Sequence, residues 1–288
     1  MSHPPAEIHP EAETVRCLLE LECPELCELP IRIVGEGWDN FTFRVGQRYA
    51  VRLPRRKVAV SLLANEQRWL PVLAPRLSLE VPELVHLGRA NELFPWPWSV
   101  VNWVAGDTAE THFLQSTDTV PLAQALHELH QPAPDDAPVN PHRGVPLSIK
   151  SEIVEERMNR LRRIETDLSR LEAIWRGGCE AKLAQDRVWV HGDLHPRNVV
   201  IRDGSLVGLI DWGDLNGGDA ATDIACAWML FADALHRLQF LDAYGVSDDL
   251  CRRAKAWAVH FGLALVESGE RHHMRLGAVT LERVLADT

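Results

Sequence analysis

The sequence predicts an α+β protein with a small strand-rich N-terminal part and a larger, mostly helical C-terminal part. Short alternating apolar runs separated by glycine-containing turns, which are typical of strands, gather before Val104. Beyond Gly106 most apolar residues recur at helical spacing. The chain has 288 residues, enough for two compact parts, and we expect an N-terminal domain at residues 1–104 and a C-terminal domain at residues 105–288.

The N-terminal part reads as a five-stranded antiparallel sheet with one inserted helix. The strands are expected from alternation, and the inserted helix from the spacing of Val60, Leu63 and Leu70. In chain order we expect a helix over about Glu11–Leu21, three strands within Ile31–Pro54, a helix over Val58–Leu73, and single strands within Val81–Gly88 and Trp98–Val104.

The C-terminal part reads as helical apart from one hairpin. A helix is expected over Pro121–Gln131, and a proline-rich loop over Pro132–Pro146. A long charged amphipathic helix is expected over roughly Ser148–Arg176. The apolar runs on either side of Asp203-Gly204 predict a hairpin, because Asp-Gly favours the tight turn that joins two strands. From about Ala220 onward the pattern is helical again.

The composition restricts the function classes. The chain is 46% hydrophobic and 25% charged, as in ordinary globular proteins, and no apolar run is long enough to cross a membrane. A net charge of −11 argues against a nucleic-acid partner, and nothing indicates a membrane partner or an oligomeric state. A polar N-terminus without a secretion signal and six scattered cysteines predict a cytoplasmic protein with reduced thiols.

Polar residues at the open end of the expected hairpin carry the strongest chemical signal. Folding the hairpin about its turn brings Asn198 opposite Ile210 or Asp211. Amide and carboxylate oxygens are hard ligands suited to Mg²⁺, which completes its shell with phosphates and water. Asp193 precedes Asn198 in a loop interrupted by Pro196 and can face the same point without being a ligand.

The segment HGDLHPRN, His191–Asn198, resembles the catalytic loop of kinase-like phosphotransferases, and Asp211-Trp212-Gly213 stands where those enzymes carry Asp-Phe-Gly. Together with the following GDAATDIA, these segments resemble the aminoglycoside phosphotransferase family, which also includes macrolide phosphotransferases and has choline kinases as relatives. The resemblance implies a two-lobed protein-kinase-like fold. It also implies an ATP- and Mg²⁺-dependent enzyme that phosphorylates a hydroxyl of a small molecule.

The same resemblance implies roles for individual residues. Asp193 would orient and deprotonate the attacking hydroxyl, while Asn198 and Asp211 would hold Mg²⁺ on the nucleotide phosphates. His195 would lie near the transferring phosphate. Asp223 would be the buried aspartate that supports the catalytic loop.

The nucleotide-binding residues are less clearly marked. Gly35 and Gly37 lie in the turn between the first two expected strands, which would cover the phosphates, although a plain hairpin turn would look the same. Arg52 occupies the position of the family's phosphate-binding lysine, and Glu66 would be its helix partner. Lys57 is expected to be a solvated residue at a helix start.

The segment WSVVNWVAGD resembles the hinge that binds the adenine edge through backbone groups. We place these groups at the carbonyl of Asn102 and the amide of Val104. Backbone recognition leaves no side-chain signature, so the sequence does not distinguish ATP from GTP. A plain core strand is the alternative.

Several alternatives stay open at this stage. His191, Asp193 and His195 alternate and could form a metal triad. Structural roles are expected for most other polar candidates: a turn or cap for Asp214, a helix N-cap for Asp219, and packing for His127 and His130.

The acceptor is an expectation only. An aminoglycoside-type antibiotic, inactivated by modification as a form of resistance, is the first candidate and a macrolide the second. Acidic residues could receive a polycation or simply be solvated; they are Asp135, Asp136, Glu152, Glu155 and Glu156. The rival functions are a metabolic kinase for choline-like or sugar-like alcohols and a catalytically silent nucleotide-binding regulator.

Overall fold

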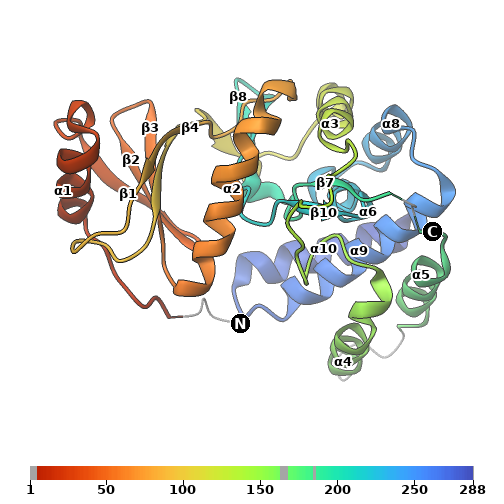
Figure 1. The fold of residues 1–288 in the computed structure, drawn as a ribbon. Coiled ribbons are helices and arrows are strands. Elements are labelled where there is room, and N and C mark those ends of the chain that lie inside the picture. Colours follow the sequence, from red (N-terminus) through yellow and green to blue (C-terminus); the bar gives the residue numbers. More distant parts are fainter. Residues whose placement is uncertain (1–4, 163–167, 184–185, 288) are drawn as a thin grey trace. The chain divides into compact units, whose positions relative to one another are not determined.

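The structure is a computed structural model that describes residues 5–162, 168–183 and 186–287 (Figure 1). The chain divides into two compact units. The N-terminal unit comprises the residues up to Gly106 together with Val207–Gly213, and the C-terminal unit comprises Asp107–Leu206 and the chain from Asp214 onward. The expected single domain boundary after Val104 is therefore incomplete, because the segment Val207–Gly213, which carries Asp211, belongs to the N-terminal unit.

The N-terminal unit is built on an antiparallel five-stranded sheet, which confirms the expected strands. The strand order is β1-β2-β3-β5-β4, and each neighbouring pair is antiparallel. The strands are β1 (Ile31–Glu36), β2 (Asn40–Val45), β3 (Tyr49–Pro54), β4 (Leu84–Gly88) and β5 (Trp98–Asn102).

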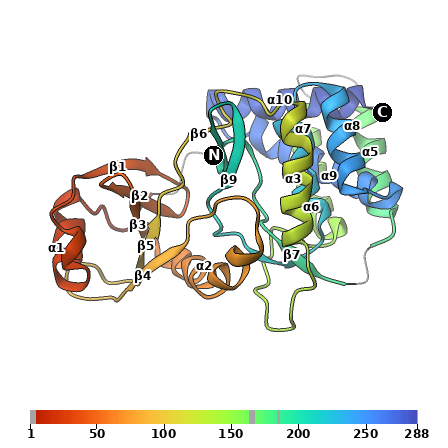
Figure 2. The same ribbon diagram turned by 90° about the horizontal axis from the view of Figure 1, so that it is seen from above.

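Two helices cover opposite faces of this sheet, α1 (Ala12–Glu22) and α2 (Val60–Leu73) (Figure 2). Successive residues of a strand point to opposite faces. Val51 and Leu53 of β3 therefore join the apolar core under α1, whereas Arg52 between them reaches Glu66 of α2. The face that holds α2 thus presents a buried charged pair. Short 3₁₀ turns flank the helices, η1 (Pro24–Leu26), η2 (Lys57–Ala59) and η3 (Ala74–Arg76).

The C-terminal unit is mostly helical, as expected. Helix α9 packs against α10 and α5, and α3 packs against α8 (Figure 1). The helices are α3 (Ser116–Leu129), α4 (Ser151–Leu161), α5 (Ser169–Glu180), α6 (Ala221–Ile224), α7 (Ala227–Leu230), α8 (Ala234–Tyr244), α9 (Asp248–Val266) and α10 (Arg271–Ala286), with 3₁₀ turns η4 (Leu147–Lys150) and η5 (Pro196–Asn198).

The single helix expected over Ser148–Arg176 is wrong. The structure has η4 and two separate helices there, α4 and α5, and residues 163–167 of the expected helix lie outside the described residues. The chain turns back on itself, because α5 packs against η4 and a Cβ on its Gly178 would lie 3.2 Å from Leu147. A continuous straight helix could not make this contact, so tertiary packing overrides a continuous amphipathic pattern.

In the described parts of the chain, five further short strands form two small sheets with the orders β6-β8-β9 and β10-β7, and the part of β9 from Val207 onward belongs to the N-terminal unit. These strands are β6 (Asp107–Thr108), β7 (Val188–Val190), β8 (Val199–Arg202), β9 (Ser205–Leu209) and β10 (Asn216–Gly218). The expected hairpin is confirmed, with Asp203 and Gly204 at positive φ between β8 and β9. No helix among the described residues is long and apolar enough to cross a membrane, and all six cysteines are free thiols.

Candidate active site

A buried carboxylate holds the start of the loop His191–Asn198 in the C-terminal unit. The side chain of Asp223 is fully buried and accepts hydrogen bonds from the backbone N–H of His191 at 2.7 Å and of Gly192 at 2.8 Å. The Nε2 atom of His130 lies 3.2 Å from the same carboxylate. These contacts are the ones expected for Asp223. They fix the backbone just before Asp193, because a buried carboxylate keeps its hydrogen bonds to backbone donors when no water can replace them.

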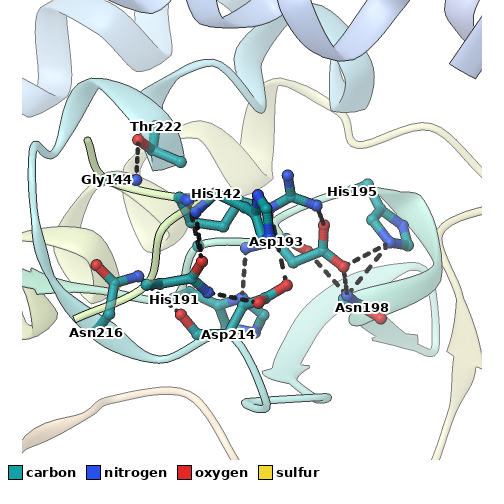
Figure 3. A network of polar contacts seen from close by, with 12 residues as sticks. His142, Gly144, His191, Asp193, His195, Asn198, Asp214, Asn216 and Thr222 are labelled. Carbon is teal, nitrogen blue, oxygen red and sulfur yellow. Dashed lines mark hydrogen bonds and ion pairs between the residues drawn. The ribbon is translucent and has the colours of Figure 1, made fainter. Parts of the chain in front are cut away.

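Gly192 lets two segments approach closely beside Asp193. Its φ of 87° is in the left-handed region, and a Cβ at this position would lie 2.7 Å from the carbonyl oxygen of Asp214. Only glycine combines this φ with this contact. The carboxylates of Asp193 and Asp214 are thereby brought to the same side of the loop (Figure 3).

Neighbouring side chains fix the carboxylate of Asp193 (Figure 3). The Nδ2 atom of Asn198 donates to the Asp193 carbonyl oxygen at 2.8 Å and lies 3.3 Å from Oδ2 of the same residue. His195 Nε2 also lies 3.3 Å from that Oδ2. The backbone N–H of Arg197 donates to Nδ1 of His195 and holds the ring beside the carboxylate.

Arg143 is a site residue that the sequence did not reveal. Its Nη2 atom donates to Oδ1 of Asp193 at 3.2 Å, and its Nε atom lies 3.7 Å from Oδ2 of Asp214. Asn140 fixes the turn, because its Oδ1 accepts from the backbone N–H of Arg143 and its Nδ2 donates to Asp214 at 2.6 Å. The Asn140-Pro141 pair indicates a turn in the sequence, but it does not indicate that this turn lies beside the loop of Asp193, and Arg143 was missed for that reason.

The charges around Asp193 keep it ionised. Burial opposes the charge of this carboxylate, but the nearby His195, Arg143 and His191 outweigh burial, and the pKa of Asp193 lies below its usual range. In turn, burial acts against the charge of Arg143, while Asp193 and Asp214 raise the pKa of Arg143. The loop thus presents a fixed acceptor for a hydrogen bond at neutral pH.

Arg52 forms a second cluster of charges in the N-terminal unit. One guanidinium nitrogen pairs with Oε1 of Glu66, and Nη2 lies 2.8 Å from Oδ1 of Asp211. The expected Arg52–Glu66 pair is therefore present. Burial acts against the charge of Arg52, while Glu66 and Asp211 raise the pKa of Arg52. The side chain of Asp211 is 50% exposed, whereas those of Arg52 and Glu66 are 8% and 4% exposed.

Asp211 has an uncommon backbone conformation. Its φ is 62°, and only one other described residue besides glycines, Asp203 in the hairpin turn, has a positive φ. Aspartate tolerates this region better than most residues, but the conformation still costs free energy and is found mainly at turns and functional sites. The strained backbone of Asp211 therefore sets the direction of a half-exposed carboxylate.

The glycine turn between β1 and β2 is held by its own neighbours. Gly35 lies within β1, and the N–H of Gly37 donates to the carbonyl of Asn40 at 2.9 Å. The carbonyl of Gly37 accepts from Nη1 of Arg55 at 2.7 Å. Arg55 is thus committed to the turn, and Lys57 begins η2 at the surface, as expected for a solvated residue.

The residues proposed as the hinge lie at the end of β5. Asn102 is its last residue, and the N–H of Asn102 donates to the carbonyl of Glu83 at 2.8 Å. Val104 lies just beyond the strand and is buried. The structure thus places both at a strand end, and their contact with a base stays a prediction.

The alternative roles resolve as follows. Among the residues described, no three His, Cys, Asp or Glu side chains are grouped so that they could hold a metal ion, which speaks against the triad of His191, Asp193 and His195. His127 stacks on Tyr244 and His130 contacts its hydroxyl, so both have the expected structural roles. Asp219 accepts from the backbone N–H of Ala221 at the start of α6 and pairs with Arg253.

Two predicted metal ligands lie in different units, Asn198 in the C-terminal unit and Asp211 in the N-terminal unit. Their pairing stays a prediction.

Comparisons with known proteins agree with the sequence motifs. Residues 30–257 match the family model of the phosphotransferase enzyme family. The uncharacterized protein YcbJ of Bacillus subtilis (strain 168) is 22% identical over 261 residues, which cover 82% of this chain and 83% of that protein.

Two solved structures illustrate the fold. The GDP and kanamycin complex of APH(2")-IIia has a TM-score of 0.71 at 19% identity and covers 95% of this chain and 97% of that one. The apoenzyme of the macrolide 2'-phosphotransferase MphH from Brachybacterium faecium has a TM-score of 0.60 at 20% identity, covering 92% and 97%. The expected kinase-like fold is confirmed, and, because the family model spans most of the chain, this protein is a member of the phosphotransferase enzyme family.

Proposed function

We propose that the protein transfers the γ-phosphate of ATP, with Mg²⁺, to a hydroxyl of a small molecule. The observation that carries the proposal is the carboxylate of Asp193, which is fixed by Asn198 and His195 and kept ionised by His195 and, to a smaller extent, by Arg143. A phosphoryl group in transfer needs positioning and charge neutralisation more than covalent help. An ionised, immobile acceptor can orient the attacking hydroxyl and take its proton as the bond to phosphorus forms.

The donor atoms fit Mg²⁺. Asn198 turns its amide nitrogen to Asp193, so its amide oxygen is the atom available to a cation. Asp211 contributes a half-exposed carboxylate, of which Arg52 contacts one oxygen. We assign one metal ligand to each residue, as the family motif implies; bound Mg²⁺ would neutralise charge on the phosphates.

The other assigned residues complete the nucleotide site. We assign Arg52, oriented by Glu66, to the phosphates, and the turn of Gly35 and Gly37 to covering them. The backbone groups of Asn102 and Val104 are assigned to the base. His195, which lies beside Asp193, is assigned to the transferring phosphate. GTP remains a donor to be tested beside ATP, because APH(2")-IIia was solved with GDP.

The acceptor is proposed only at the level of class. Kanamycin is bound in one structural neighbour, and another is named as a macrolide phosphotransferase, so both antibiotic classes belong in the first test. Choline-like and sugar-like alcohols are the metabolic alternative. A silent nucleotide-binding regulator is disfavoured, because such a protein would have no use for the fixed carboxylate of Asp193.

The test is nucleotide consumption by the purified full-length protein, with ATP or GTP and Mg²⁺, across aminoglycosides, macrolides, choline and sugar-like alcohols, both neutral and anionic. We expect Mg²⁺-dependent nucleotide binding in every case and acceptor-dependent release of ADP or GDP with one class. A protein that bound neither nucleotide in the presence of Mg²⁺ would contradict the proposal.

A further inference from the structure

Basic side chains gather around Arg143 in the C-terminal unit. Lys150 ends η4, and its Nζ atom donates to the carbonyl of Pro141 at 2.9 Å, two residues before Arg143. Arg157 comes from α4, which packs against α9, and His260 comes from α9. Lys150, Arg157 and His260 are 8%, 9% and 6% exposed. We call Arg143, Lys150, Arg157 and His260 the basic cluster.

The members of the basic cluster interact electrostatically with one another. Burial, followed by Arg157, Arg143 and Lys150, lowers the pKa of His260 well below its usual value. Burial, followed by Arg143 and Arg157, also lowers the pKa of Lys150. The ring of Phe261 connects two of the members, because its centre lies 5.1 Å from the guanidinium of Arg143 and 5.7 Å from the ring centre of His260. His260 is therefore neutral and three cations remain.

The positive charge of the cluster is under-compensated. The nearest carboxylate to Arg157 is that of Glu267, 3.5 Å from Nε, but this carboxylate already accepts two hydrogen bonds from Arg160, at 2.5 and 3.0 Å. Within the described part of the chain, the buried Nη1 atom of Arg157 and Nδ1 of His260 have no hydrogen bond, and the buried Nε of Arg157 has only the long contact with the shared carboxylate of Glu267. A buried guanidinium that shares one carboxylate and leaves a nitrogen without an acceptor is only partly compensated.

The acidic residues considered as a polycation site do not lie among these cations. Glu152, Glu155 and Glu156 lie on the exposed side of α4, and Asp135 and Asp136 are exposed in their loop. Arg157 lies on the buried side of the same helix. The charge next to Asp193 is thus positive, and the negative charge of α4 is turned to solvent.

We propose that the basic cluster binds an oxyanion of the acceptor, a carboxylate or a phosphate, and thereby holds the acceptor's hydroxyl toward Asp193. Arg143 connects the two functions, because one guanidinium contacts Asp193 and the cluster begins beside it. Buried arginine with unused donors is suited to planar or tetrahedral oxyanions. The inference rests on the proposed function and refines it: the acceptor is an anionic alcohol, not a polycation.

The decisive experiment measures anion binding without any transfer reaction. Inorganic phosphate and malonate are titrated into the full-length protein at constant ionic strength, and the shift of the thermal unfolding midpoint is recorded. We expect a saturable rise with at least one of the two, and the comparison shows whether the cluster prefers phosphate or carboxylate. The Arg157→Met variant should bind that anion about ten- to hundredfold more weakly, the usual effect of losing a charge-assisted hydrogen bond.

Two further variants separate this role from a structural one. Arg162→Gln removes an exposed charge at the end of α4, where Arg162 pairs with Glu172, and should leave anion binding unchanged. Arg157→Met should also unfold close to the wild-type temperature, because Glu267 keeps Arg160 as its partner and a buried guanidinium that shares one carboxylate is lost. Arg157→Lys should restore part of the binding.

The inference is overturned if neither anion shifts unfolding saturably or if Arg157→Met binds as the wild type does. Phosphorylation of kanamycin with kinetics unchanged in Arg157→Met would also overturn it, while leaving the proposed phosphotransfer intact. The proposed function instead fails on the absence of Mg²⁺-dependent nucleotide binding, which the anion titration does not measure.

Discussion

Each unit contains an arginine between two carboxylates, and the two arrangements differ in tightness. In the N-terminal unit, Arg52 contacts Glu66 and Asp211, and its side chain is 8% exposed. In the C-terminal unit, Arg143 contacts Asp193 at 3.2 Å and Asp214 at 3.7 Å, and its side chain is 25% exposed. Arg52 is thus held in the interior, whereas Arg143 has looser, partly solvated contacts. We call Arg52, Glu66 and Asp211 the N-terminal cluster. We call Arg143, Asp193 and Asp214 the C-terminal cluster.

The difference suggests a division of tasks. A buried ion pair is costly to break, so Arg52 and Glu66 act as a fixed support whose geometry does not depend on ligands. A partly exposed pair contributes little stability, so the contact of Arg143 with Asp193 can be adjusted when a hydroxyl approaches. Substitutions in the two clusters should therefore have different effects on folding and on transfer.

The largest effect is expected for Asp193→Asn, which keeps the shape of the C-terminal cluster and removes its acceptor charge. Transfer should fall by at least about 10²–10⁴-fold, the usual contribution of proton acceptance alone, while nucleotide affinity stays close to that of the wild type. Single-turnover rates and nucleotide titration measure the two quantities. Loss of nucleotide binding in parallel with activity would show that Asp193 is not the base.

Asp211→Ala is the next most severe change, because it removes a full charge from the N-terminal cluster. We expect Mg²⁺-dependent nucleotide binding to weaken on the order of 10²-fold, and less for Asn198→Ala, which removes a neutral ligand. Mg²⁺ titrations of both variants at fixed nucleotide give the order. The reverse order would assign the main metal ligand to Asn198.

The two clusters also differ in how far the sequence predicted them. Arg52 and Glu66 lie on a strand and a helix that the sequence pattern predicts, and the resemblance to the family indicated which residues of these elements would pair. Arg143 lies in a proline-rich loop, where position depends on tertiary contacts such as the bond from Gly144 N–H to Thr222 Oγ1, 3.0 Å long. Sequence periodicity carries no information about such contacts.

Arg157 was missed for another reason. The pattern of α4 marks it as one charge among several, and only the packing of α4 on α9 shows that it is buried. The break between α4 and α5 was missed for the same reason, because both helices have amphipathic patterns that run on without an obvious stop signal. The first three N-terminal strands, in contrast, are separated by glycine-containing turns, and the N-terminal elements were placed nearly at their observed bounds.

Arg52→Ala tests whether the N-terminal cluster is a support as well as a ligand. It leaves Glu66 buried without its partner, so the free energy of unfolding should fall by about 3–5 kcal/mol, and the Michaelis constant for ATP should rise roughly ten- to hundredfold. Arg52→Lys should retain most activity. Arg56→Ala is the control, because it removes only a partly exposed pair with Asp39 and should cost about 1 kcal/mol or less.

The double variant Arg52→Ala, Glu66→Gln sharpens this test. Since the two residues act as a unit, their combined effect on unfolding should be smaller than the sum of the single effects. Additive effects on stability, together with unchanged ATP kinetics, would mean that Arg52 neither supports the cluster nor contacts the nucleotide.

The smallest effect is expected for Arg143→Met, which opens the looser cluster. The contact with Asp193 is partly exposed, so turnover at neutral pH should fall only about two- to fivefold. The pH dependence should change more clearly. Arg143 is one of the charges that hold the pKa of Asp193 below its usual range, so its removal raises that pKa.

Because Asp193 must be ionised to accept a proton, activity is lost as pH falls through its pKa, and a raised pKa moves this loss to higher pH. Turnover of Arg143→Met between pH 4 and pH 8, checked for intact folding at each point, should therefore decline at a higher pH than turnover of the wild type. Arg162→Gln, which removes an exposed charge away from Asp193, should follow the wild-type profile. An unshifted profile in Arg143→Met would mean that His195 and His191 alone keep Asp193 ionised and that Arg143 serves only the basic cluster.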